Sequence, residues 1–274
     1  MTAFTDPQLA LAWVVRLAAL GVLIDALQRL VCWRAHRDEG VLGWAWLRTR
    51  RRWLRWPPVV VFLRHPHYLG ALALQGVAAL FLVLFPRYAP GRAVAVWVVF
   101  GVALLTHLRN ALYGLYGANR MLLVIFVALA CWSLAPESAL VTAACLWFLA
   151  LRACLSYATA GWYRLTLPSW RRGTALYEIF NTPMLGSPRI ASLLGRHPWM
   201  NRALTWSTWV MECSFPLVLL VGFPAGYLFL GWGVAFHLGI AVTMGLNTFV
   251  WAWLATYPAI IYSAYAMQGR IGLG

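Results

Sequence analysis

The chain has 274 residues, of which 62% are hydrophobic and only 11% are charged. Soluble domains are usually about 45–50% apolar and about 25% charged, so this composition excludes an ordinary water-soluble protein. All 22 basic residues are arginine, and the formal net charge is +15. Because the chain has no lysine, no reaction step can use a lysine amine. We predict an all-α, polytopic integral membrane protein, because the apolar runs are continuous and not alternating.

These apolar runs predict about eight membrane-spanning helices in a single transmembrane domain that covers residues 1–274. A helix needs roughly 20 mostly apolar residues to cross a bilayer. Such runs occur at 9–33, 68–85, 93–108, 121–133, 139–159 and 203–221, with two more within 227–267. We expect the last two to separate near 244–247, where glycine and asparagine interrupt the run. The first residues carry no basic segment, so no cleaved signal peptide is expected.

Arginine gathers in two segments that predict the orientation of the chain. An Arg/Trp-rich interfacial segment occupies residues 34–66, and a second arginine-rich loop occupies residues 162–202. In the eight-helix arrangement both lie on one side, which the positive-inside rule assigns to the cytoplasm. Within the first segment, LRTRRRWLRW at 47–56 mixes arginine with tryptophan, as interfacial helices do. Anionic lipids of the bilayer are therefore the expected partners of these loops, and nucleic acid is not.

Ionisable side chains inside apolar spans are functional candidates, because burying them in a bilayer is costly. Glu212 and His237 fall near the middle of the sixth and seventh spans. They could pair with each other, or with Arg109 or Arg164, and such pairs would hold helices together. Alternatively, a carboxylate and an imidazole in such surroundings could transfer protons. The sequence leaves both alternatives open.

Two other polar groups favour structural roles. Asp25 and Arg29 stand four residues apart on one face of the first span, which predicts an ion pair. In RHPHYLG, at 64–70, two histidines have no third ligand nearby in the sequence, and a metal ion needs three or four ligands. No metal site is therefore expected.

A short polar segment follows the fifth apolar run. In SYATAGWYRLTLPSWRRGTAL, Ser156–Leu176, four residues stand out: Tyr157, Tyr163, Arg164 and Trp170. Such side chains can anchor a helix end at the membrane interface. They can also form a positively charged, aromatic-walled pocket mouth that suits an anion or a quinol headgroup.

Four segments follow one another in a recognisable order. They are LRNALYGLYGANRM at 108–121, CLSYATAGWYRLTLPSWRRGTAL at 154–176, WVMECSFPLVLL at 209–220 and FHLGIAVTMGLNTFVWAWLATYPAII at 236–261. Their order and spacing resemble the HTTM (horizontally transferred transmembrane) domain family, the bacterial relatives of vitamin K-dependent gamma-carboxylase. The resemblance implies a multi-pass protein of the bacterial cytoplasmic (inner) membrane that acts in peptide or protein maturation.

The resemblance also implies a quinone or hydroquinone cofactor and a set of site residues. In the family, a lysine in an AGxxKL-like stretch deprotonates the hydroquinone, and the matching position in AGWYRL is Arg164. Arginine can bind an anion but cannot take that proton, so gamma-carboxylation itself is not expected. The implied catalytic residues are Arg164, His237 and Glu212. The implied cofactor-binding residues are Tyr157, Tyr163, Trp170, Arg109 and Asn119.

Two classes of function stay open. One is a membrane enzyme of the carboxylase-like kind, dependent on a quinol and acting on a peptide substrate. The other is a non-catalytic structural or assembly subunit with a membrane protein partner, which the missing lysine permits. Transport is less favoured, because no inverted repeat is visible in the two halves of the sequence.

Overall fold

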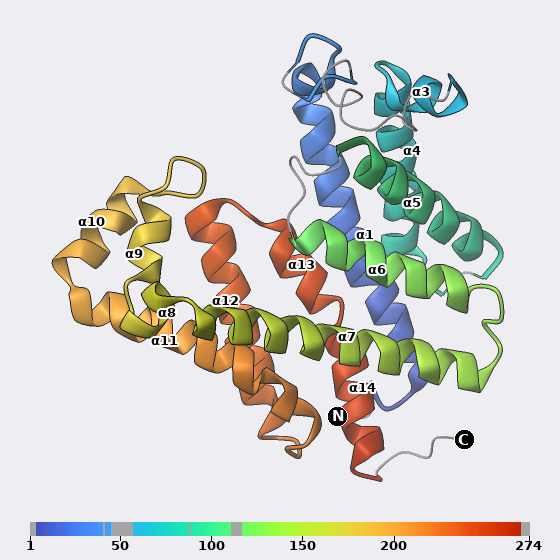
Figure 1. The fold of residues 1–274 in the computed structure, drawn as a ribbon. Helices are drawn as coiled ribbons and strands as arrows, with labels where there is room; N and C mark the ends of the chain where they lie inside the picture. The colour runs from blue at the N-terminus through green and yellow to red at the C-terminus, as the bar shows by residue number, and fades with distance from the viewer. Residues whose placement is uncertain (1–3, 41, 45–56, 88, 111–116, 270–274) are drawn as a thin grey trace.

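The computed structural model describes residues 4–40, 42–44, 57–87, 89–110 and 117–269. Every regular element in these ranges is a helix (Figure 1). The all-α prediction is therefore confirmed for the described residues. The arginine–tryptophan stretch at 47–56 lies outside them, so its interfacial helix stays a prediction.

Five helices in the described residues are long and apolar enough to cross a membrane. They are α1 (Pro7–Val31), α4 (His67–Leu84), α5 (Ala89–Asn110), α7 (Ala139–Thr166) and α12 (Gly226–Met244). A further apolar helix, α6 (Gly117–Trp132), has only 16 residues. The five helices support a polytopic membrane protein, although they are fewer than the eight spans expected from the sequence.

Capping side chains explain where two of the long helices begin. Asp6 precedes α1, and its carboxylate accepts a hydrogen bond from the backbone N–H of Gln8 at 2.9 Å. Ser138 precedes α7, and its hydroxyl accepts from the N–H of Val141 at 3.3 Å. Each cap satisfies one of the N–H groups that the first turn of a helix leaves without a partner.

The predicted sixth span is not one continuous α-helix. It divides into α11 (Pro198–Ser214) and the short 3₁₀-helix η5 (Phe215–Leu219). Pro216 lies in the first turn of η5, where its missing N–H and its ring cannot continue the preceding helix. The break is hard to predict from the apolar composition of the run, because Pro216 is the only residue near it that disfavours a continuous helix.

The long C-terminal run is broken twice, where one break was expected. α12 ends at Gly245, whose φ of 71° belongs to the left-handed region that favours glycine, and this confirms the predicted break. Two short helices follow, α13 (Thr248–Leu254) and α14 (Tyr257–Met267). Pro258 stands in the first turn of α14, a position that proline favours.

α1 lies at the centre of the helical assembly and contacts α4, α7, α13 and α14 (Figure 1). Its inward residues are small, and Ala10, Ala18 and Ala19 are fully buried. Small residues allow helix backbones to approach closely in a membrane. At Gly21 an added methyl group would lie 2.8 Å from Cβ of Trp251 on α13, so glycine is required for this contact.

The predicted cytoplasmic loop at 162–202 is largely helical. After the end of α7 it forms α8 (Pro168–Arg172), α9 (Ala175–Phe180) and α10 (Pro188–Arg196). Phe180 and Leu194 form a small apolar core there, against Met200 of α11 and Met244 of α12. These short helices therefore lie directly beside α11 and α12, which carry the predicted site residues Glu212 and His237.

Candidate functional site

The centre of the candidate site is an ion pair between Arg164 and Glu212. α7 continues past its predicted end and carries Arg164 in its last turn, while Glu212 lies in the last turn of α11. The Glu212 side chain is only 4% exposed, whereas the Arg164 side chain is 25% exposed. Because an unpaired buried carboxylate is costly, the charge of Arg164 is what permits a charged Glu212 at this position.

Gly161 and Trp170 fix the geometry of this pair. An added methyl group at Gly161 would lie 2.7 Å from both the backbone nitrogen and the Sγ of Cys213 on α11, so only glycine lets α7 and α11 approach this closely. On α8, the Trp170 ring centroid lies 4.4 Å from Cζ of Arg164, a cation–π contact. The guanidinium is therefore held between a carboxylate and the face of an indole.

A second polar pair consists of Tyr157, two turns before Arg164 on α7, and His237. The Tyr157 hydroxyl lies 2.7 Å from Nε2 of His237 on α12, and both side chains are buried. The Tyr157 ring stacks on Phe215 with ring centroids 3.9 Å apart, and the His237 ring lies 4.8 Å from Trp253. Nδ1 of His237 is buried and makes no hydrogen bond within the described part of the chain. Buried polar atoms usually have a hydrogen-bond partner, so a ligand or a water molecule is expected at Nδ1.

An apolar groove adjoins the first pair. It has a volume of about 320 Å³ and is lined by residues of α9, α10, α11 and α12. Phe236 lines the groove, and its ring centroid lies 6.0 Å from Cζ of Arg164. Thr208 lines it one helical turn before Glu212. The groove therefore ends beside the Arg164–Glu212 ion pair.

Five of the eight predicted site residues thus lie in one region, which we call the Arg164 cluster. It consists of Tyr157, Arg164, Trp170, Glu212 and His237. Of the remaining three, Tyr163 is on α7 but is 65% exposed, so it lies on the outer surface of that helix. The other two, Arg109 and Asn119, belong to a different part of the protein.

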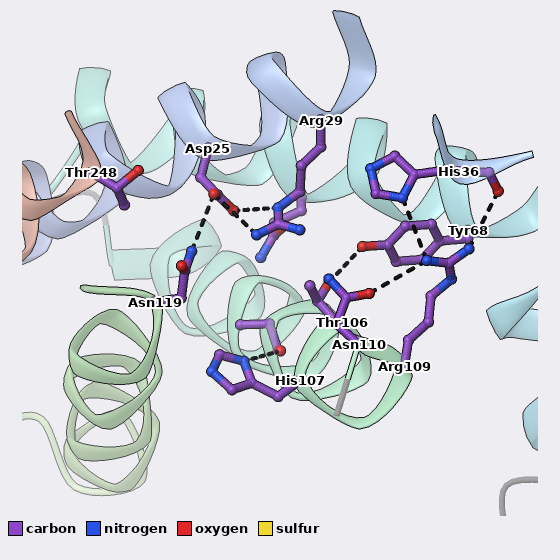
Figure 2. Close-up of polar contacts among 12 residues, drawn as sticks. Asp25, Arg29, His36, Tyr68, Thr106, His107, Arg109, Asn110, Asn119 and Thr248 are labelled. Carbon is purple, nitrogen blue, oxygen red and sulfur yellow. Dashed lines mark hydrogen bonds and ion pairs between the residues drawn. The ribbon is translucent and has the colours of Figure 1, made fainter. Parts of the chain in front are cut away.

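Arg109 lies in the last turn of α5 and contacts the 3₁₀-helix η2 (Trp33–His36), α3 (Pro57–Leu63) and α4 (Figure 2). It is fully buried, its Nε donates to the carbonyl oxygen of Leu63 at 3.0 Å, and its Cζ lies 4.2 Å from the Tyr68 ring centroid. Nη2 donates to the carbonyl oxygen of His36 at 3.3 Å. These contacts use the guanidinium to hold backbone segments together, and they leave it away from the Arg164 cluster.

Asn119 belongs to a neighbouring polar group, in which it hydrogen-bonds with Asp25 (Figure 2). Nδ2 of Asn119 donates to Oδ1 of Asp25 at 3.1 Å, and Oδ2 of Asp25 lies 2.7 Å from Nε of Arg29. The ion pair predicted between Asp25 and Arg29 is therefore confirmed. A cavity of about 20 Å³ lies against these residues together with Gln75 and His107, which is room for about one water molecule.

α13 lies between the two groups of polar residues. Its Trp253 contacts His237, and its Phe249 stacks on Trp253 with ring centroids 5.4 Å apart. On the other side, Phe249 lies 3.9 Å from the position of a methyl group added at Gly117 of α6. Two aromatic rings thus separate Asn119 and its neighbours from the Arg164 cluster.

Gly233 is a part of the site that sequence reasoning missed. A methyl group here would lie 3.2 Å from both the Tyr157 hydroxyl and the Phe215 ring, and it would clash with the Tyr257 hydroxyl. Gly233 therefore makes room for two tyrosine hydroxyls in front of His237. The available signal was its spacing, because Gly233 stands four residues before His237 and so shares its helix face.

The pH dependence of stability should have a contribution from His36, which follows α1 and lies outside the membrane-spanning helices. Burial and the nearby Arg109 guanidinium lower the pKa of His36 from 6.5 to about 4. The neutral ring accepts a hydrogen bond from Nη1 of Arg109 at 3.4 Å. Since the unfolded chain takes up the proton first, the stability that His36 provides above pH 6.5 should fall as the pH drops from about 6.5 to about 4.

Thermal unfolding of the detergent-solubilised protein across this pH window checks the expectation. His36→Gln should flatten the curve between pH 6.5 and 4. His67→Gln, at an exposed histidine, should keep the wild-type curve. An unchanged pH profile in His36→Gln would show that other groups carry the dependence.

The described residues form an all-helical fold with five helices long and apolar enough to cross a membrane, and with a buried polar cluster beside an apolar groove. Comparison with protein-family models, with curated proteins and with solved structures finds no match. The resemblance to the HTTM family therefore stays a prediction carried by the four sequence segments.

Proposed function

We propose that the chain binds a quinone or quinol, with its ring at the Arg164 cluster and its apolar tail in the adjoining groove. The observation that carries this proposal is the meeting of the two environments at Phe236, which lines the groove and borders Arg164. Small-molecule sites are typically apolar cavities with a few convergent polar groups. Both parts of such a site are present here.

The residues present fit such a molecule. Arg164 can donate hydrogen bonds to an oxygen of the ring while Glu212 neutralises its charge. Trp170 supplies a flat aromatic wall. Nδ1 of His237 is a nearby buried atom with a hydrogen bond to offer. When bound, the quinone would supply two-electron redox chemistry, which the side chains of this cluster do not.

We further propose Glu212 and His237 as the proton carriers of the site. Arg164 cannot act as a base, so it binds and orients. His237 can take or give a proton at Nδ1 because Tyr157 engages Nε2, and Glu212 lies on the other side of the same cluster. This assignment supports a carboxylase-like redox enzyme acting in peptide maturation, without gamma-carboxylation itself.

The proposed topology has eight spans in a bacterial cytoplasmic membrane. α6, the combination of α11 with η5, and the combination of α13 with α14 would complete the five long helices. The arginines at 162–202 support a cytoplasmic position for α8, α9 and α10 under the positive-inside rule.

Quinone retained on purification tests the proposed function. Protein taken from its native membrane in mild detergent should release a quinone on solvent extraction, measured by chromatography and absorbance. The double variant Arg164→Gln/Glu212→Gln should retain about tenfold less, because it lacks the charged donor but leaves no unpaired buried charge.

Arg172→Gln is the matched control, since it removes one exposed arginine of the adjacent α8 and should retain the wild-type amount. Wild-type protein without quinone, but in stable association with another membrane protein, would contradict the proposal. That result would favour the alternative of a non-catalytic assembly subunit.

A further inference from the structure

A second cleft is formed by residues from the N-terminal third of the chain, apart from the Arg164 cluster. It has a volume of about 610 Å³ and lies between the first half of α1 and the end of α4 with the residues that follow it. Its walls are mostly apolar, formed by Leu9, Trp13, Leu84 and Phe85, and it shares no lining residue with the groove beside Arg164. Two arginines, Arg16 and Arg87, also line it.

Arg16 is a charged residue within a helix that is apolar enough to cross a membrane. Its Nε donates to the carbonyl oxygen of Val83 at 3.0 Å, and its Cζ lies 5.3 Å from the Trp13 ring centroid. Within the described residues its two terminal nitrogens make no hydrogen bond or ion pair. Burying a guanidinium in the membrane without a partner costs free energy. We therefore expect an anion to accept hydrogen bonds from these two nitrogens.

Arg87 supplies a second positive charge at the same cleft. It is exposed, and among the described residues it too forms no ion pair. No acidic side chain of the described residues lines the cleft. The cleft therefore carries two positive charges that no acidic side chain of the described residues pairs with.

We propose that this cleft binds the phosphate group of an anionic phospholipid. Arginine pairs with phosphate in bidentate fashion, and Arg16 and Arg87 would take the headgroup from two sides. Leu84, Phe85 and Leu9 provide an apolar wall for an acyl chain. Trp13 suits the boundary between headgroups and chains. The apolar walls favour a lipid over a soluble anion with the same phosphate chemistry.

Native mass spectrometry of the full chain in detergent tests the proposal, with phosphatidylglycerol and phosphatidylcholine as probes. The delipidated wild-type protein should bind one phosphatidylglycerol saturably and more tightly than phosphatidylcholine. Arg16→Gln/Arg87→Gln should weaken phosphatidylglycerol binding about tenfold or more. Arg92→Gln is the matched control: it removes an arginine from the start of α5, outside the cleft, and should bind phosphatidylglycerol as the wild type does.

Arg87→Gln alone covers the case in which the Arg16 substitution prevents folding, because Arg87 is exposed and follows the end of α4. It should still weaken phosphatidylglycerol binding. Equal binding of both lipids, or equal weakening by Arg87→Gln and Arg92→Gln, would overturn the site. Displacement of phosphatidylglycerol by inorganic phosphate at equal concentration would assign the cleft to a soluble anion and overturn the lipid.

Discussion

Arg164→Gln should destabilise the protein by about 3–5 kcal/mol, because it leaves Glu212 as a buried carboxylate without its partner. Glu212→Gln should cost less, since the Arg164 side chain is 25% exposed whereas that of Glu212 is 4% exposed. Trp170 also remains against the guanidinium in that variant. The order of the two losses therefore follows from the unequal burial of the partners.

The double variant Arg164→Gln/Glu212→Gln should be more stable than Arg164→Gln alone, because no charge is then buried. Equilibrium unfolding in mixed detergent micelles would measure all four proteins as a double-mutant cycle. Residues in direct contact typically show coupling of about 0.5–3 kcal/mol. Additive losses would mean that the two side chains do not interact in the folded protein.

The fold was largely predictable wherever an apolar run was interrupted by a residue with one clear conformational effect. Gly245 ends α12 where the sequence predicted a break. α7, in contrast, continues past its predicted end near residue 159 to Thr166, and Pro168 begins α8. Pro216 and Pro258 were overlooked because both stand inside apolar runs that are long enough for a span. Composition over a window of about 20 residues averages such single positions away.

The site was predictable in part for a different reason. Tyr157, Arg164 and Trp170 come from one short segment, so the chain itself brings them close together. Glu212 and His237 lie on other helices, and their polarity inside apolar runs was the signal that found them. Asn119 was assigned to the site from the resemblance alone. Its surroundings depend on which helices pack against α6, and in the structure its side chain contacts Asp25 on α1.

The polar network around Arg109 had no comparable signal. The carbonyl oxygens of Leu63 and His36 are its main acceptors, and every residue has such an oxygen. A sequence pattern cannot distinguish an arginine that binds a ligand from one that binds backbone. The difference arises from packing, which here places Tyr68 over the guanidinium and buries it fully.

Gly161→Ala should cost about 1–3 kcal/mol of stability or more, although it adds only one methyl group. The new Cβ would lie 2.7 Å from the backbone nitrogen of Cys213 and 3.0 Å from Cβ of Glu212, and backbone atoms cannot rotate out of the way. Overpacking of this kind typically costs about 1–3 kcal/mol and occasionally more. If α7 and α11 instead move apart, the Arg164–Glu212 ion pair is lengthened and the buried carboxylate loses part of its compensation.

Gly101→Ala is the matched control, because the same methyl group on α5 would meet no atom within 4 Å. Alanine also favours helix over glycine, so this variant should unfold at the wild-type midpoint or slightly above it. The same micelle experiment compares the two, and quinone retention can be followed in both. Equal midpoints for the two variants would mean that α7 and α11 do not meet at Gly161. A loss confined to Gly161→Ala would instead tie the stability of the Arg164 cluster to the closeness of these two backbones.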